Sequence, residues 1–369
     1  MKNKLFKSFT LFLSFTMVLS LALSITTTKL ASAAADNTWY YNELNAQQKA
    51  FYTILYNKLQ NTYSNTSSNI VFNITSSDLA NVNLSFGCND DITPIVQPAY
   101  NALIYDHPEL FWINYVKLAQ FGWSCSSSSS GSMFISVDNM IIDTINVSVP
   151  ALPNSAADKK KIDSTISNYA VTGSNNYEKL KNIHDYLANK IAYPAHGTNL
   201  DPPRYHNIAG ALVDNSAVCE GYSKAFKILC DKAGIPCVLA SGTLYGNTSG
   251  PHMWDCVKME DGNWYAVDVT LDDQDPLLFY DYFLSGSNTV ATSLVKQAFN
   301  KTHVPDNSFS DATPANYPPP TLSSVAYSKN TNNTMPDTTT IDTTTSPDTT
   351  LYNPDTTSTL QSNTTNTAV

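Results

Sequence analysis

Residues 218–237 read VCEGYSKAFKILCDKAGIPC, and residues 250–273 read GPHMWDCVKMEDGNWYAVDVTLDD; these two stretches decide the expected fold. In the first, apolar side chains recur with the period of a helix. Gly234 stands where a C-terminal cap belongs, and Pro236 ends the run. We therefore expect a helix that begins at about Cys219.

A cysteine at the start of a helix can act as a nucleophile. Backbone N–H groups point out of the first turn and the helix dipole favours negative charge there, so Cys219 is expected to be a reactive thiolate. The same N–H groups can hold the oxyanion that forms when a thiolate attacks a carbonyl carbon. Cys219 is therefore the candidate nucleophile.

The second stretch is expected to form an antiparallel hairpin, because the turn residues 260–262 separate two strand-like runs. Side chains of an antiparallel pair alternate between faces, so the loop length decides whether His252 and Asp268 share a face. A two-residue loop would place them on opposite faces. A three-residue loop with Gly262 left-handed places Asp268 opposite Trp254 and diagonal to His252 on one face. We predict this register, or a bulge with the same parity.

Cys219, His252 and Asp268 then have the residue types of a catalytic triad. Cys219 would attack an amide carbonyl and form a thioester, and His252 would move the proton from the thiol to the leaving amine. Asp268 would fix the ring tautomer and stabilise the imidazolium. Each residue alone has an equally good structural explanation, but their order, spacing and expected elements agree.

The two stretches resemble the transglutaminase-like superfamily, with its C-x-G-Y/F, H-x-W and W-Y-x-V-D-x-T motifs. The match covers about residues 175–285, in which Cys219, His252 and Asp268 stand at the family's catalytic positions. The resemblance implies an α+β, papain-like core, with the nucleophile helix packed on an antiparallel sheet. It also implies a secreted cysteine enzyme that passes an acyl group to an amine (cross-linking) or to water (peptidase or deamidase).

The oxyanion hole departs from the family pattern. In some transglutaminases a tryptophan upstream of the nucleophile completes the hole, but the polar residues near that place here are Tyr205, His206 and Asn207. The second oxyanion donor is therefore unassigned.

Changes of composition divide the chain into four segments. A positive start, an apolar stretch and the small residues 31–33 identify residues 1–33 as a signal peptide. Residues 36–150 are expected to form an N-terminal α+β region, and residues 160–300 a transglutaminase-like catalytic domain. Residues 306–369, rich in Thr, Ser, Asn and Pro, are expected to be a disordered tail. We expect the mature protein to be secreted, extracellular or at the cell surface.

Periodicity also predicts elements around the motifs. Tyr222 is expected to pack the nucleophile helix on the sheet, Trp254 and Trp264 to lie in the core, and His184 to be a packing residue. Helices are expected over 45–59, 95–105, 159–169 and 177–191, and strands over 69–85, 111–119 and 133–137.

Charge limits the partners. The formal net charge is −10, and residues 1–33 contain four lysines and no acid, so the mature chain is more acidic still. Phosphate backbones repel such a protein, which argues against nucleic-acid binding. No later apolar stretch is long enough for a membrane span. The expected partner is a protein or peptide substrate, and the oligomeric state is left open.

No cofactor or metal is expected. None of the six cysteines forms a C-x-x-C pair, which argues against structural zinc. Cys88 and Cys125 could form a disulfide, and the apolar runs around Cys230 and Cys256 favour buried free thiols. The acids Asp272, Asp273 and Asp275 do not match a calcium loop and are expected to be solvated.

A non-catalytic module that binds cell-surface peptides or polymers is the alternative function. The presence of Cys219, His252 and Asp268 together counts against it, because a pseudoenzyme is free to lose at least one of them. A glycosidase would need paired carboxylates at a defined separation. Asp272, Asp273 and Asp275 cluster after the last strand, but such a run of acids in a loop is usually solvated surface.

Overall fold

The computed structural model describes residues 38–114, 117–127, 140–195, 202–246, 249–274, 276–293, 295–306 and 317–329. The expected signal peptide, the strand expected over 133–137 and most of the expected tail lie outside these ranges. The described chain is α+β with antiparallel sheets, as the sequence predicted. Among the described residues, no helix combines the length and apolar character needed to cross a bilayer.

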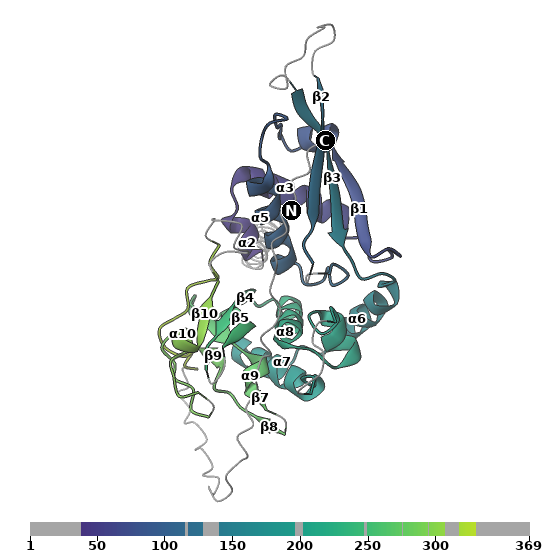
Figure 1. Cartoon of the computed structure of the whole chain (residues 1–369). Coiled ribbons are helices and arrows are strands. Elements are labelled where there is room, and N and C mark those ends of the chain that lie inside the picture. Colours follow the sequence, from purple (N-terminus) through teal and green to yellow (C-terminus); the bar gives the residue numbers. More distant parts are fainter. Residues whose placement is uncertain are drawn as a thin grey trace, which may run out of the picture.

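The N-terminal part is a three-stranded antiparallel sheet with helices on one side (Figure 1). The sheet order is β1-β3-β2, and the disulfide between Cys88 and Cys125 ties β2 to the loop before α5. The elements are α2 (Trp39–Glu43), α3 (Ala46–Leu59), β1 (Asn69–Thr75), α4 (Ser76–Ala80), α5 (Thr93–Asp106), β2 (Gln120–Ser127) and β3 (Met140–Pro150).

Two strand predictions in this part need correction. The strand expected over 69–85 ends at Thr75, because the Thr75 side chain and Asp78 form a capping box that starts α4. The strand expected over 111–119 is wrong for residues 111–114, which form turns and a single bridge between Ile113 and Ala151.

The second part is a helical layer packed against a five-stranded antiparallel sheet of order β10-β4-β5-β6-β9 (Figure 1). The central helix α8 contacts β4 and β5, and α7 lies against α8. The helices are α6 (Ala156–Asn168), α7 (Asn176–Lys190), the π-helical turn η2 (Gly210–Asp214), α8 (Cys219–Ala233), α9 (Val269–Asp272) and α10 (Phe299–Thr302). The strands are β4 (Cys237–Leu244), β5 (Gly250–Lys258), β6 (Trp264–Val267), β7 (Asp273–Gln274), β8 (Leu277–Leu278), β9 (Phe283–Ser285) and β10 (His303–Pro305).

The N-terminal part packs on β4. The Tyr40 hydroxyl donates a 2.6 Å hydrogen bond to the Leu239 carbonyl, and the Tyr105 and Ser241 hydroxyls lie 2.7 Å apart. Because both contacts reach the strand beside β5, the N-terminal part supports the sheet that carries the candidate site.

A short C-terminal segment, residues 317–329, departs from the expected disordered tail. It runs beside β6, where Leu322 bridges Trp264 and the Ser323 N–H donates to the Trp264 carbonyl. The Trp39 indole donates to the Pro318 carbonyl at 3.0 Å, so the segment contacts both parts of the molecule. Composition alone does not predict this ordered segment, because the few residues that pack beside β6 lie within a polar stretch.

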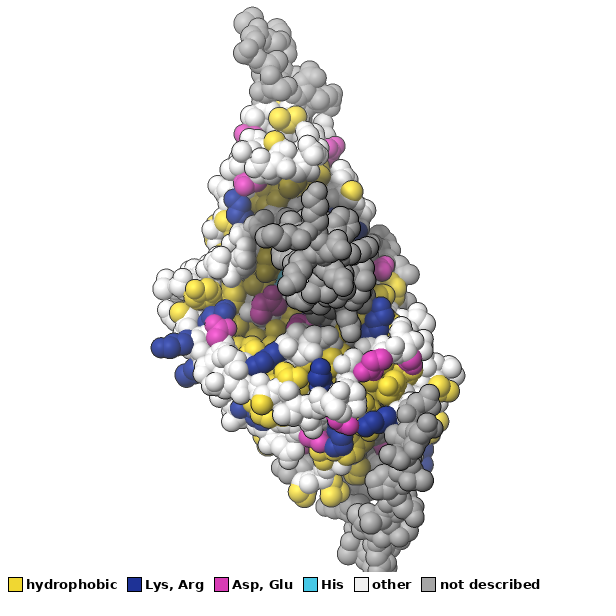
Figure 2. All heavy atoms as spheres, turned by 180° about the vertical axis from the view of Figure 1, so that it is seen from behind, with side chains coloured by type: hydrophobic (Ala, Val, Ile, Leu, Met, Phe, Trp, Pro, Cys, Tyr) yellow, Lys and Arg dark blue, Asp and Glu magenta, His cyan; other side chains and the backbone are white. Residues whose placement is uncertain are grey.

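Charged side chains of both signs lie interspersed on the face drawn in Figure 2.

Candidate active site

Cys219 is the first residue of α8, as the sequence predicted. Val218 is the N-cap in extended conformation, and the helix ends at Gly234, whose φ of 71° is left-handed. Cys219 thus belongs to the first turn of α8, and the residue is only 9% exposed. Cys230, Cys237 and Cys256 are also free but lie in the core, as expected for Cys230 and Cys256.

The hairpin has the predicted register. Asp255 pairs with Val267 and Lys258 with Trp264, which fixes the three-residue loop 260–262. Gly262 is left-handed, with a φ of 83°. This parity places His252 and Asp268 on one face, although Asp268 itself lies just beyond β6.

Asp268 is also the N-cap of α9. Its side chain accepts a 3.1 Å hydrogen bond from the backbone N–H of Leu271, so one carboxylate oxygen, Oδ1, is held by the helix that follows. The other oxygen, Oδ2, lies 2.5 Å from Nε2 of His252. Both residues are buried, which strengthens their interaction.

The charges of His252 and Asp268 stabilise each other. Burial alone would lower the pKa of His252, but the Asp268 charge and the nearby Cys219 outweigh it and raise the pKa to about 10. Burial alone would raise the pKa of Asp268, but the charge and hydrogen bond of His252 hold it well below its ordinary value. The imidazole is therefore poised to be an imidazolium at neutral pH.

The ring orientation leaves Nδ1 for the thiol. Nε2 of His252 faces Asp268, whereas Nδ1 is buried and makes no hydrogen bond of ordinary geometry. Cys219 is close enough to contribute, by charge and by hydrogen bonding, to the raised pKa of His252. The structure thus places Cys219 near the His252–Asp268 pair.

The aromatic residues of the motifs have structural roles. Trp254 and Trp264 are buried in the core, as expected. The Tyr222 hydroxyl lies 2.8 Å from the Ile191 carbonyl and 2.7 Å from Asp273 Oδ2. It therefore ties α8 to the end of α7 and to β7, and its ring is buried in the core.

The start of α8 carries a partly buried cluster of ionisable side chains. The two carboxylate oxygens of Glu220 lie 2.8 Å from Nδ1 of His206 and 2.5 Å from Nζ of Lys224. Burial would raise the pKa of Glu220, but Lys224 and His206 lower it to about 2. A Cβ on Gly221 would lie 2.6 Å from the Tyr205 carbonyl, so this glycine lets residues 205–207 approach the nucleophile helix.

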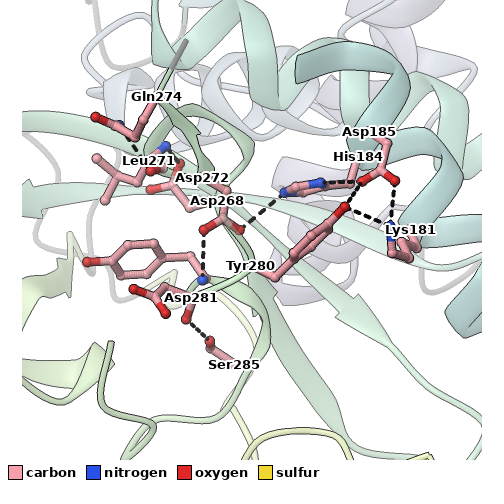
Figure 3. Close-up of polar contacts among 11 residues, drawn as sticks. Lys181, His184, Asp185, Asp268, Leu271, Asp272, Gln274, Tyr280, Asp281 and Ser285 are labelled. Atoms are coloured by element: carbon pink, nitrogen blue, oxygen red, sulfur yellow. Dashed lines mark hydrogen bonds and ion pairs between the residues drawn. The ribbon is translucent and has the colours of Figure 1, made fainter. Parts of the chain in front are cut away.

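A second buried pair supports the segment that carries Asp268. Figure 3 shows His184 between Asp185 and the α9 segment, and its Nδ1 and Nε2 lie 3.1 Å from Asp185 and 3.2 Å from Asp272. Asp272 Oδ1 also accepts from the backbone N–H of Tyr282, whose carbonyl accepts from the N–H of Asp268. His184 is thus a packing residue, as predicted, and it also braces this segment.

Asp272 was expected to be a solvated loop acid, and this expectation is wrong. Its side chain is 0% exposed, because α9 turns it inward toward α7. Burial, opposed in part by His184, raises the pKa of Asp272 to about 6. Sequence periodicity could not reveal this, since α9 is a single turn.

Sequence reasoning missed His303. It lies in β10, where it pairs with Leu244 of β4, and its Nε2 is 3.1 Å from Asp268 Oδ2. The imidazole is buried and stacks on Phe299 with ring centroids 4.0 Å apart. Asp268 Oδ2 therefore faces two imidazoles.

The donor atoms of His252, Asp268 and His303 lie within 4.8 Å of one another, a set that could hold a metal ion. Ligands about 2.0 to 2.1 Å from a tetrahedral zinc ion lie about 3.3 Å apart. The separation of 2.5 Å between His252 Nε2 and Asp268 Oδ2 is shorter and fits a charged hydrogen bond. A metal ion would have to open this pair.

Among solved structures, a transglutaminase (TGase) is 17% identical with a TM-score of 0.27, and the match covers 41% of this chain and 44% of that one. The periplasmic domain of TgpA from Pseudomonas aeruginosa is 15% identical with a TM-score of 0.20, covering 43% and 68%. This chain thus spans less than half of that transglutaminase, and TM-scores this low carry no argument about activity. The comparison with curated proteins found no match.

The family model agrees with the motifs. The matched region contains all three members of the Cys219, His252 and Asp268 set, as well as the whole of α8. Residues 164–269 match the transglutaminase-like superfamily, which confirms the resemblance found in the sequence.

Proposed function

We propose that this chain is a cysteine enzyme that forms an acyl thioester at Cys219 from an amide of a protein or peptide. The observation that carries the proposal is the buried His252–Asp268 pair beside a cysteine at a helix N-terminus. Paired in this way, the imidazole has a pKa of about 10 and stabilises a thiolate next to it. A binding module would have no need for this arrangement of charges.

The reaction would follow from these positions. The Cys219 thiolate attacks the amide carbonyl carbon, and N–H groups at the start of α8 stabilise the negative oxygen. His252, charged and facing the sulfur through Nδ1, gives its proton to the leaving amine as the C–N bond breaks. Asp268 accepts the Nε2–H bond throughout and keeps the ring oriented.

The second half of the reaction sets the product. Water attacking the thioester gives a carboxylic acid and makes the enzyme a peptidase or deamidase, whereas a lysine-like amine gives a new amide and makes it a cross-linking enzyme. His252 takes the proton of either acceptor, and the thiolate leaves. The same triad serves both acceptors, so the product has to be measured.

We propose that the protein works outside the cytoplasm. The segment 1–33 has the pattern of a cleaved export signal. The disulfide between Cys88 and Cys125 supports an oxidising compartment, because such bonds persist there and are rare in the cytosol.

The test uses the mature chain from Ala34 with glutamine-containing peptides, with and without a primary amine, followed by mass spectrometry. We expect amine-adducted, deamidated or cleaved peptides, and their type identifies the acceptor. Cys219→Ala is the control and should abolish every product. A broad peptide set left unchanged by both proteins would favour the alternative, a peptide- or polymer-binding module.

A further inference from the structure

We propose that His303 is a positioning residue for this site: its Nε2–H donates to Asp268 Oδ2 and holds that oxygen against His252. The inference rests on the proposed function, because it concerns how Asp268 supports His252 during acyl transfer. It adds a residue from β10, outside the matched region and outside the segment in which the motifs lie.

The contacts of Asp268 fix its side chain. Oδ1 accepts from the backbone N–H of Leu271 at 3.1 Å, and Oδ2 faces Nε2 of His252 at 2.5 Å and Nε2 of His303 at 3.1 Å. Without His303, Oδ2 of Asp268 would be buried with His252 as its one hydrogen-bond partner, because Leu271 binds Oδ1. His303 supplies the second, from the opposite edge of the sheet, and so limits rotation of the carboxylate.

The tautomer of His303 follows from its partners. Burial lowers the pKa of His303 more than Asp268 raises it, so the ring is neutral and carries one N–H. The carboxylate of Asp268 can only accept, which assigns that proton to Nε2. Nδ1 lies 2.8 Å from the Thr302 hydroxyl, whose single hydrogen can go either to Nδ1 or to the Phe299 carbonyl 3.1 Å away.

A neutral donor suits this position. Several ionisable groups interact with Asp268, and they differ in charge. A second cation at the position of His303 would compete with His252 for the Asp268 carboxylate. Neutral His303 supplies a hydrogen bond without neutralising the charge. The groups concerned are His252 and Asp255 on β5, Asp272 on α9, Tyr282 before β9 and His303 on β10.

Packing holds the His303 ring in place. It stacks on Phe299 with an interplanar angle of 3°, and the Trp254 ring meets it edge-on at 5.2 Å. β10 is the edge strand next to β4, so the hydrogen bond to Asp268 forms only when residues 299–305 dock on the sheet. The orientation of Asp268 therefore depends on the segment that closes this edge.

The test measures alkylation of Cys219 by iodoacetamide against pH in the mature full-length chain, with the modified peptide quantified by mass spectrometry. This measurement needs no amide substrate, and Cys219→Ala is the control for background alkylation. His303→Phe keeps a ring against Phe299 and removes the donor, whereas His303→Gln keeps a donor and removes the ring. Phe299→Leu is the control for packing, since it leaves both imidazoles in place.

Without the His303 donor, Asp268 Oδ2 is held less firmly against His252, so the imidazolium is stabilised less and the pKa of His252 falls. We expect His303→Phe to move the alkaline limb of alkylation downward by about one to two pH units, the usual worth of a hydrogen bond to a charge. His303→Gln should move it less than half as far. Phe299→Leu should lower the melting temperature and leave the limb in place.

An unmoved limb in folded His303→Phe would overturn the proposal, and so would an equal shift in Phe299→Leu. If His303→Phe does not fold, ¹⁵N NMR of the wild-type ring decides: the proposal requires the neutral Nε2–H tautomer, and an Nδ1–H tautomer or an imidazolium would refute it. Wild-type protein that shows the expected limbs but converts no amide would refute the proposed function and leave the role of His303 standing.

Discussion

Asp268→Asn is the substitution whose effect can best be worked out from the structure. It removes the charge that faces His252 at 2.5 Å and changes little else in the shape of the side chain. The asparagine amide can still accept the Leu271 N–H bond, so the start of α9 is preserved. The expected effect is therefore electrostatic.

The pKa of His252 gives the magnitude. It is raised to about 10, against an ordinary value of about 6.5. That difference corresponds to about 5 kcal/mol, the net of burial, which lowers the pKa, and of Asp268 and Cys219, which raise it. Without Asp268, burial pulls the pKa to about 6.5 or below, and the fraction of imidazolium at pH 8 falls about 30-fold or more.

The sign for stability follows from the same numbers. The folded-state pKa of His252 is raised, so the pair stabilises the fold fully below about pH 6.5 and loses this contribution as the pH rises through about 10. Asp268→Asn should lower the free energy of unfolding at pH 6 by about 3 to 5 kcal/mol. The deficit relative to wild type should shrink above pH 10.

The assay combines alkylation of Cys219, peptide turnover and urea unfolding, each measured against pH. The control is Asp255→Asn on the same strand. Burial raises the pKa of Asp255 well above its ordinary value, so its charge is disfavoured and its amide should change the profiles much less than Asp268→Asn does. If Asp268→Asn keeps an alkaline limb near pH 10, Asp268 is not the group that charges His252, and the mechanism proposed above fails.

Three further outcomes are expected. Gly221→Ala should lower the free energy of unfolding by about 1 to 3 kcal/mol, because the new methyl group meets the Tyr205 carbonyl and this cost exceeds the helix propensity gained; a more stable variant would contradict the contact. Asp272→Leu should cost about 3 to 5 kcal/mol in urea unfolding by leaving buried donors unpaired, and Asp272→Asn clearly less; equal losses would show that the hydrogen bonds do not matter. Cys88→Ser with Cys125→Ser should cost about 4 kcal/mol for a sequence separation of 37 residues, and reducing agent should have the same effect on wild type alone.

The hairpin shows how much of the site local sequence could predict. Loop length and one glycine set the register of two neighbouring strands, so the shared face of His252 and Asp268 followed from residues 260–262. The start of α8 was equally local, because its period and its glycine cap lie within one stretch.

The position of His303, in contrast, could not be predicted from local sequence. β10 joins the sheet beside β4, which is about sixty residues earlier in the sequence, and no short-range pattern encodes that pairing. It also lies beyond residue 300, where the catalytic domain was expected to end. One local feature could have drawn notice: a histidine in the short run 299–305, whose aromatic and apolar residues suggest burial.

Three buried carboxylates lie near His252, and their pKa values are shifted in different directions. Asp268 faces a cation and two further donors, so its pKa is low. Asp255 and Asp272 have raised pKa values, first because of burial and in part because of the negative charge of Asp268 itself. With the charge of Asp255 disfavoured by burial and Asp272 paired with His184, the charge of Asp268 acts on His252 with little opposition. A site that holds one imidazolium beside a thiol needs one carboxylate that stays ionised. The neighbouring acids do not interfere with it, because one is disfavoured as an anion and the other is paired with a histidine.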